Sequence, residues 1–264
     1  MSTDGRLGPA ASDIGDALAF FTRVPLARGD GQPLDMNRIA WAAPVAGAIV
    51  GLVGAGVLAA TQVFGLPRLI SAGLATAALI GVTGALHEDG LADTADGFGG
   101  GSTRDRKLEI MRDSRIGAFG AVALTLSILI RVGALAAALK GGFWNAAGAL
   151  ILVAALSRAG ALMPLAALGP ARADGAGATA GRLDPAAFAA SCGVALVIAV
   201  IVGILATGFW RALAAAFASA IGAAAMTALA RRQIGGQTGD VAGAAQQWAE
   251  IGAWCGLLIG RSEA

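Results

Sequence analysis

The sequence predicts an all-α integral membrane protein of about seven transmembrane helices, with an Asp-rich cytoplasmic loop and an N-terminal amphipathic helix. Hydrophobic residues make up 56% of the 264 residues and charged residues only 14%, and the mean hydropathy is +0.72. Soluble domains contain about 25% charged residues. The 40 glycines indicate closely packed membrane helices, because small residues let helix backbones approach each other. We expect a single polytopic domain over residues 1–264.

The predicted elements follow one another in chain order. Ile14–Leu26 alternates apolar and polar residues at helical spacing, which predicts an amphipathic helix on the membrane surface. Most of the apolar segments after it are long enough for the roughly 20 residues that a spanning helix needs. The last segment is weaker, because Gln246, Gln247 and Glu250 interrupt its first half. The segments are residues 39–63, 69–86, 116–139, 144–168, 186–208, 212–230 and 241–260.

Basic residues give the predicted topology a direction. If the N-terminus is cytoplasmic, 13 of the 19 Lys and Arg residues lie in inside segments and four in outside segments. Such a bias is typical of cytoplasmic loops, so we expect the Asp-rich segment, the Arg172–Arg182 loop and Arg231–Asp240 to face the cytoplasm. The net charge of +2 is close to neutral and does not indicate a nucleic-acid partner. The four outside residues are Arg68, Lys140, Arg211 and Arg261.

Three aspartates form the strongest functional pattern. Asp89, Asp93 and Asp96 are spaced i, i+4, i+7, which places them within about 60° on one face of a helix. Carboxylates beside a membrane are costly unless they are paired, hydrated or bound to a metal. Oxygen ligands suit a hard divalent cation such as Mg²⁺. We therefore expect this face to bind metal, although the spacing does not choose between one and two ions.

The segment Arg104–Arg115 gathers further charges after the aspartates. Glu109 and Asp113 are spaced i, i+4, and Arg112 and Arg115 are spaced i, i+3. Two interpretations stay open: a surface helix with ion pairs, or arginines that bind phosphates while Glu109 and Asp113 add to the metal site. The chain has no Gly-x-x-x-x-Gly-Lys-Ser/Thr loop, which excludes a P-loop nucleotidase.

The third polar segment is the glycine-rich Gly235–Asp240. It could bring backbone amides close to an anion, or it could be a plain turn between helices. Asp240 and Glu250 fall on one helix face of about 80°, and that face enters a predicted span, where an unpartnered carboxylate is costly. Arg131 and Arg158 lie inside predicted spans. We expect each to pair with a buried carboxylate or to contact a substrate phosphate.

These motifs together resemble the cobalamin (5′-phosphate) synthase family, also called adenosylcobinamide-GDP ribazoletransferases. The resemblance covers nearly the whole chain in order, and Glu88 is a departure where the family usually has an apolar residue. The motifs that carry it are Phe20–Pro25, His87–Gly97, Arg106–Gly120, Ser157–Arg158, Gly235–Asp240 and Glu250.

The resemblance implies a multi-pass enzyme of the bacterial cytoplasmic (inner) membrane. In that family adenosylcobinamide-GDP reacts with α-ribazole, or its 5′-phosphate, to give adenosylcobalamin, or its 5′-phosphate, and GMP. It implies Mg²⁺ as cofactor, the lipid bilayer as surroundings, and homo-oligomers or association with other cobalamin-assembly enzymes as candidate assemblies. The expected roles are catalysis by Asp89, Asp93, Asp96 and Asp240, metal binding by Asp89, Asp93, Asp96, Glu109 and Asp113, and substrate binding by Arg112, Arg115, Arg158, Gly236, Thr238 and Glu250.

Two other functions remain alternatives. A membrane phosphotransferase that uses a CDP-alcohol also needs an Asp-rich face, but its usual Asp-Gly-x-x-Ala-Arg continuation is absent after Asp96. An ion-coupled transporter would place its acidic residues at the middle of the membrane, whereas here they cluster at one edge.

Overall fold

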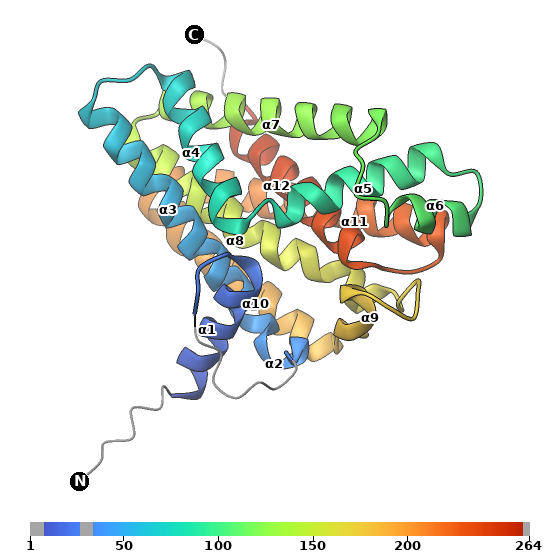
Figure 1. The fold of residues 1–264 in the computed structure, drawn as a ribbon. Coiled ribbons are helices and arrows are strands. Elements are labelled where there is room, and N and C mark those ends of the chain that lie inside the picture. The colour runs from blue at the N-terminus through green and yellow to red at the C-terminus, as the bar shows by residue number, and fades with distance from the viewer. Residues whose placement is uncertain (1–7, 27–33, 261–264) are drawn as a thin grey trace.

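The structure is a computed structural model that describes residues 8–26 and 34–260. The regular secondary structure of these residues is helical apart from one isolated β-bridge. Seven helices of 16 to 26 residues form the bundle (Figure 1). They are α3 (Ala43–Val63), α4 (Arg68–Thr83), α7 (Ala118–Leu139), α8 (Phe143–Ala167), α10 (Pro185–Val202), α11 (Phe209–Ile234) and α12 (Gly239–Leu258). The shorter elements are α1 (Pro9–Phe21), α2 (Met36–Ile39), η1 (Ala40–Ala42), α5 (Leu86–Gly100), α6 (Arg104–Ile110), α9 (Ala176–Ala180) and η2 (Gly203–Thr207).

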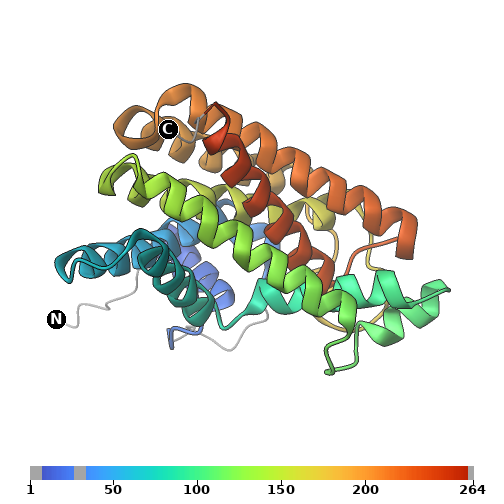
Figure 2. The same cartoon turned by 90° about the horizontal axis from the view of Figure 1, so that it is seen from above.

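Helix α8 is the centre of the bundle. It is buried along most of its length, and α3, α10, α11 and α12 pack around it. Seen from above, α12 lies between α7 and α11 (Figure 2). The outward faces of α7, α10 and α11 carry exposed Leu129, Val197 and Phe217. A hydrophobic helix buried on all sides, surrounded by helices with apolar outer faces, is the arrangement expected of a membrane protein.

Small residues let these helices touch through their backbones, as the composition predicts. A side chain on Gly51 of α3 would place its Cβ 2.6 Å from the Cα of Ile151 on α8. Between α11 and α12, a Cβ on Gly256 would lie 2.5 Å from the carbonyl oxygen of Ala214. Neither position can carry a larger residue without moving a helix, so both contacts need glycine.

The chain bends sharply between α4 and α5, which corrects the predicted span 69–86 and the predicted Asp-rich loop. Helix α4 ends at Thr83, and the axes of α4 and α5 differ by 88°. Gly84 and Ala85 both have positive φ angles, of 63° and 57°. A left-handed conformation is free for glycine but strained for alanine. The Asp-rich segment is therefore a helix that runs across the end of α4.

The structure also revises the number of spans. Among the described residues, five helices are long and apolar enough to cross a membrane alone, or six if α4 and α5 count as one bent span. Helix α12 is continuous over 20 residues but too polar to qualify. Its polar side chains Gln246, Gln247 and Glu250 are buried among other helices rather than exposed to lipid.

The segments predicted to share one side of the membrane do meet at one end of the bundle. Arg104 at the start of α6 donates from Nε to the carbonyl oxygen of Ile234, 2.9 Å away, at the end of α11. The turn after α11 is joined to the 168–172 segment, because Ala171 N donates to the Gln237 carbonyl oxygen at 2.8 Å. Helices α5, α6 and α9 all lie at this end, which we call the polar end (Figure 1).

The two ends of the bundle should lie on opposite sides of the membrane. Ser102 lies between α5 and α6 at the polar end, and Lys140 follows α7 at the other end; both are exposed. In a background with Cys192→Ala and Cys255→Ala, we expect Ser102→Cys and Lys140→Cys to react with an impermeant thiol reagent from opposite sides of sealed vesicles. Labelling of both sites from the same side would contradict the arrangement.

Candidate functional site

The site is built where α5 crosses α12 at backbone contact. A Cβ on Gly90 would lie 2.7 Å from the carbonyl oxygen of Asp240 and 3.1 Å from the Cα of Gly243. A Cβ on Gly243 would lie 3.4 Å from the carbonyl oxygen of His87. Because neither residue has a side chain, the two helices approach closely, and the aspartate beside Gly90 is brought toward the first turn of α12.

The crossing brings the carboxylates of Asp89, Asp93 and Asp240 near one another. They lie on α5 and α12, which are not among the five helices that qualify as spans on their own. Burial raises the pKa of Asp93 to about 7, and the nearby charges of Asp89, Asp240 and Asp96 add to the rise. Burial likewise raises the pKa of Asp240, with a smaller contribution from Asp89. Like charges at short range disfavour ionisation, so this group of carboxylates would be stabilised by a bound cation.

Arg172 is the cation beside this group. Its Nη2 lies 3.4 Å from Oδ2 of Asp240, and its Nε lies 3.8 Å from Oδ1 of Asp174. Its Nη1 is buried and has no hydrogen-bond partner. A partly buried guanidinium with a spare donor beside carboxylates is suited to a phosphate oxygen. Sequence reasoning placed Arg172 on the polar side but gave it no role, since nothing in its local motif links it to Asp240.

Asp96 does not face the other aspartates as the helical spacing predicts. Its carboxylate accepts hydrogen bonds from the backbone N–H of Gly117, at 2.7 Å, and of Gly120, at 2.9 Å. These amides belong to the unpaired first turn of α7, which favours a negative charge. Both oxygens of Asp96 therefore cap α7. Asp96 is not part of the proposed metal site.

The charged residues of 104–115 pair with each other or with neighbouring segments near the surface. Glu109 lies 2.7 Å from Arg106, and Asp113 accepts hydrogen bonds from Arg115, which lower its pKa to about 2. Arg112 forms an ion pair with Asp174. The surface interpretation thus describes the geometry of Glu109, Asp113 and Arg115. These side chains do not join Asp89 and Asp93.

The Gly235–Asp240 segment is a tightly packed turn between α11 and α12. A Cβ on Gly236 would lie 2.7 Å from the carbonyl oxygen of Gly169, so glycine makes room for the neighbouring segment. The hydroxyl of Thr238 accepts from the N–H of Val241 at 3.2 Å, which caps α12, and donates to Asp240 at 3.2 Å. Gly236 and Thr238 thus have structural roles, while Asp240 lies at the site.

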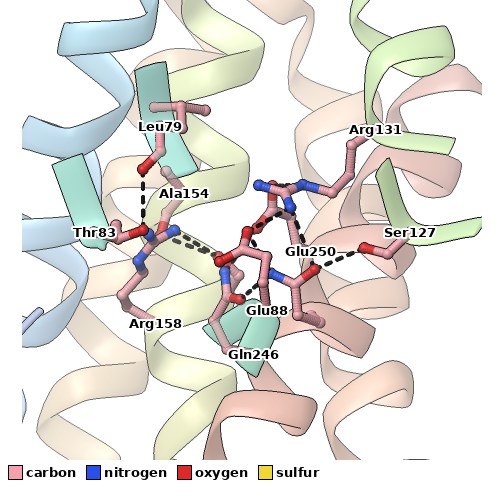
Figure 3. A network of polar contacts seen from close by, with 11 residues as sticks. Leu79, Thr83, Glu88, Ser127, Arg131, Ala154, Arg158, Gln246 and Glu250 are labelled. Carbon is pink, nitrogen blue, oxygen red and sulfur yellow. Dashed lines mark hydrogen bonds and ion pairs between the residues drawn. The ribbon is translucent and has the colours of Figure 1, made fainter. Parts of the chain in front are cut away.

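A buried ion-pair network holds α5 against α7 and α12 (Figure 3). Arg131 of α7 donates from Nη1 to Glu88 of α5, at 2.6 Å, and from Nε to Glu250 of α12, at 2.8 Å. The three side chains are between 4% and 8% exposed, so the pairs are shielded from water. The structure confirms that Arg131 pairs with buried carboxylates.

Amide and hydroxyl groups complete this network. Gln246 donates to Glu250 at 2.7 Å and to the Ser157 hydroxyl at 2.9 Å. Gln247 accepts from the Ser127 hydroxyl at 2.7 Å and donates to Gln246 at 2.9 Å. Figure 3 shows these contacts converging from α5, α7, α8 and α12. The polar face of α12 is therefore satisfied by helix–helix hydrogen bonds.

Glu250 and Arg158 were predicted to bind substrate, and the structure buries both inside the bundle instead. Arg158 is 4% exposed, and its partners among the described residues are Ala154 and Ser157 on its own helix, at 3.4 and 3.3 Å. Glu88, which sequence reasoning treated as a minor departure, is the partner that fixes Arg131 to α5. An arginine in an apolar span signals a buried carboxylate, but spacing alone does not identify the partner.

A pocket opens beside the aspartates at the polar end. Its empty volume is about 810 Å³, including the part open to solvent. Asp89 and Asp240 lie on one wall, formed by α5 and α12. Apolar residues of α1, α2, α8 and α9 form the other walls. A concave, mostly apolar lining with a few polar groups is typical of small-molecule sites.

The residues at the crossing suit a Mg²⁺ ion that is also held by substrate and water. Throughout 8–26 and 34–260, no three His, Cys, Asp or Glu side chains are close enough together to enclose a metal. Mg²⁺ is nevertheless usually bound by one or two carboxylates together with waters and substrate phosphates. The crowded carboxylates of Asp89 and Asp93, with the raised pKa of Asp93, fit that kind of site.

Comparison with known proteins identifies close relatives along nearly the entire chain. A family model described as cobalamin-5-phosphate synthase matches residues 13–258. Three relatives are each named adenosylcobinamide-GDP ribazoletransferase. That of Azorhizobium caulinodans is 50% identical over 94% of this chain and 96% of its own. Those of Xanthobacter autotrophicus and Mesorhizobium japonicum are 47% and 48% identical, over 96% and 90% of this chain and 98% and 90% of their own. No solved structure matches.

The buried network predicts a large loss of stability when Arg131 is removed. Arg131→Met keeps the length of the side chain but leaves Glu88 and Glu250 without a cation, so we expect a loss of about 3–5 kcal/mol. Thermal unfolding of the detergent-purified protein measures this. The exposed Arg115→Met is the control and should change stability little, because exposed pairs contribute little. Equal stability of the two variants would contradict the role of the network.

Proposed function

The chain belongs to the cobalamin-5-phosphate synthase family and is a membrane transferase of late cobalamin assembly, and we propose that its reaction takes place where α5 crosses α12. The observation that carries this proposal is the group formed by Asp89, Asp93, Asp240 and Arg172 beside an open pocket. This group combines carboxylates for a metal with a guanidinium for phosphate, which the transfer of a substituted phosphate requires.

The substrates of the reaction are adenosylcobinamide-GDP and α-ribazole or its 5′-phosphate. The acceptor's ribose hydroxyl attacks the phosphorus that carries the cobinamide group. A new P–O bond forms, the P–O bond of the diphosphate breaks, and GMP leaves as the hydroxyl proton is released. Negative charge accumulates on the diphosphate oxygens during this step, so catalysis depends on groups that stabilise that charge.

Asp89 and Asp93 are the residues that would hold Mg²⁺, and the ion would supply positive charge to the diphosphate when bound. Arg172 supports the same task, because its Nη1, which has no partner, can donate to a phosphate oxygen. Asp240 orients Arg172 through their 3.4 Å contact. The chain's own residues thus position the diphosphate between α5, α12 and the 168–175 segment.

The two alternative functions are less well supported than the transferase. The three relatives, which match nine-tenths or more of the chain, bear the transferase name, and none of them is named as a transporter or a CDP-alcohol enzyme. Three ionisable residues in the bundle interior, Glu88, Arg131 and Glu250, are engaged with each other. This arrangement supports a fixed scaffold more than an ion pathway.

The polar end is proposed to face the cytoplasm of a bacterial cell. The 13-to-4 distribution of basic residues supports this orientation, since cytoplasmic loops are enriched in Lys and Arg. The relatives come from bacteria. Both substrates would then reach the pocket from the cytoplasmic side.

The metal-binding carboxylates should be needed for turnover. For Asp89→Asn and Asp93→Asn we expect GMP release from adenosylcobinamide-GDP and α-ribazole to fall by about a hundredfold or more at saturating Mg²⁺, because a lost metal ligand removes several kcal/mol of transition-state stabilisation. Asp105→Asn is the matched control, since Asp105 is an exposed aspartate on α6.

The outcome separates the proposed site from other parts of the chain. The control should retain nearly the wild-type rate, and all three variants should unfold at similar temperatures. Asp93→Asn protein that is folded and as active as the wild type would rule out Asp93 as a ligand.

A further inference from the structure

We propose that the pocket beside the aspartates binds the base of the acceptor nucleoside, an apolar bicyclic heteroaromatic ring, and so determines which acceptors the enzyme accepts. The inference rests on the proposed function and specifies where its second substrate lies. Asp89, Asp240, Gln237 and His87 supply the polar groups of the pocket, and the remaining lining residues are apolar or glycine. A nucleoside likewise combines a few hydroxyls with a flat base.

Aromatic rings form the part of the pocket nearest the polar wall. Phe21 of α1 lies parallel to the ring of His87, with centroids 6.0 Å apart and an interplanar angle of 13°. Phe20 meets Phe21 edge to face at 4.9 Å and is 40% exposed. Flat heteroaromatic ligands pack well against such rings. The partly exposed ring of Phe20, packed on Phe21, therefore offers a base an aromatic surface in the pocket.

Gln237 contributes a side-chain oxygen that has no hydrogen-bond donor. Its side-chain amide donates from Nε2 to the carbonyl oxygens of Gly177, at 2.9 Å, and Gly181, at 3.2 Å. These two acceptors fix the orientation of the amide, and its Oε1 is left buried without a partner. A buried acceptor without a donor is costly. A ribose hydroxyl on the ligand would supply the missing donor.

The other parts of the substrates fit this pocket less well. Guanine carries polar groups around its edge, and the walls from α1, α2, α8 and α9 offer side chains without hydrogen-bonding groups, such as Met36, Leu162 and Ala180. Buried polar edges without partners would disfavour its binding. A corrin ring system is far larger than a nucleoside, and the apolar walls offer its polar side chains no hydrogen bonds. An apolar acceptor base matches the apolar lining of these walls.

Larger side chains on α9, a short helix at the surface of the protein, would fill the pocket. Ala176 and Ala180 line the pocket, whereas Ala178 on the same short helix does not. We compare Ala176→Leu and Ala180→Leu with Ala178→Leu in the full-length protein. For each variant the Kd for α-ribazole and the KM values for both substrates in GMP release are measured, and the acceptor series includes a riboside of the smaller base imidazole.

If the pocket binds the base, the Kd and KM values change in a specific pattern. The Kd and KM for α-ribazole rise by about tenfold or more in Ala176→Leu or Ala180→Leu, because a few methyl groups in a pocket change discrimination by that order. The KM for adenosylcobinamide-GDP and the values for imidazole riboside stay within about twofold of the wild type, and Ala178→Leu behaves as the wild type. Two pocket variants are used so that one that fails to fold does not decide the result.

Contrary results overturn the inference in distinct ways. A rise in the KM for the cobinamide substrate alone would assign the pocket to the donor. Unchanged Kd values in both pocket variants, or an equal loss of imidazole riboside and α-ribazole binding, would show that the base lies elsewhere. If the wild type binds α-ribazole but releases no GMP, the proposed function fails while the binding data still decide the pocket.

Discussion

The arrangement of the site depends on the close contact of two helix backbones. Gly90 on α5 and Gly243 on α12 have no side chains, so α5 crosses the first turn of α12 with a separation that a single Cβ would prevent. Asp89 and Asp93 belong to one of these helices and Asp240 to the other. The charge crowding among them, the contact to Arg172 and the polar wall of the pocket all follow from this crossing.

Several anchors keep α5 in that position. The bend at Gly84 and Ala85 turns it away from α4 at the cost of strain at Ala85. Asp96 ties its far end to the first turn of α7. Glu88 ties its near end to Arg131, which also binds Glu250. A buried ion pair contributes little net stability, but breaking it is costly, so these contacts specify one position for α5.

The sequence predicted the broad architecture well. Apolar segments located the seven long helices, and the distribution of arginines and lysines correctly grouped the segments that meet at the polar end. The i, i+4 spacing of Asp89 and Asp93 also placed them together at the site. Local patterns sufficed here because helix periodicity and apolar length are set by residues close in the chain.

The sequence could not predict which side chains from distant segments contact each other. Asp96 continues the i+7 face, yet its carboxylate turns to amides 21 and 24 residues away. The bend at Gly84 involves one glycine among 40, followed by an alanine with no turn signal. Glu88 lies off the aspartate face, and that position is what lets it reach Arg131. Each of these depends on contacts that only the folded bundle brings together.

The rate of GMP release by Gly90→Ala tests the central claim most directly. The added Cβ would meet the Asp240 carbonyl oxygen at 2.7 Å, so α5 and α12 must separate. We expect Gly90→Ala to stay folded but to lose about a hundredfold or more in turnover, because a displacement of catalytic groups by about 1 Å reduces the rate by that much. Gly73→Ala on α4, where a Cβ meets nothing within 4 Å, should be as active as the wild type. Wild-type turnover by folded Gly90→Ala would contradict the account.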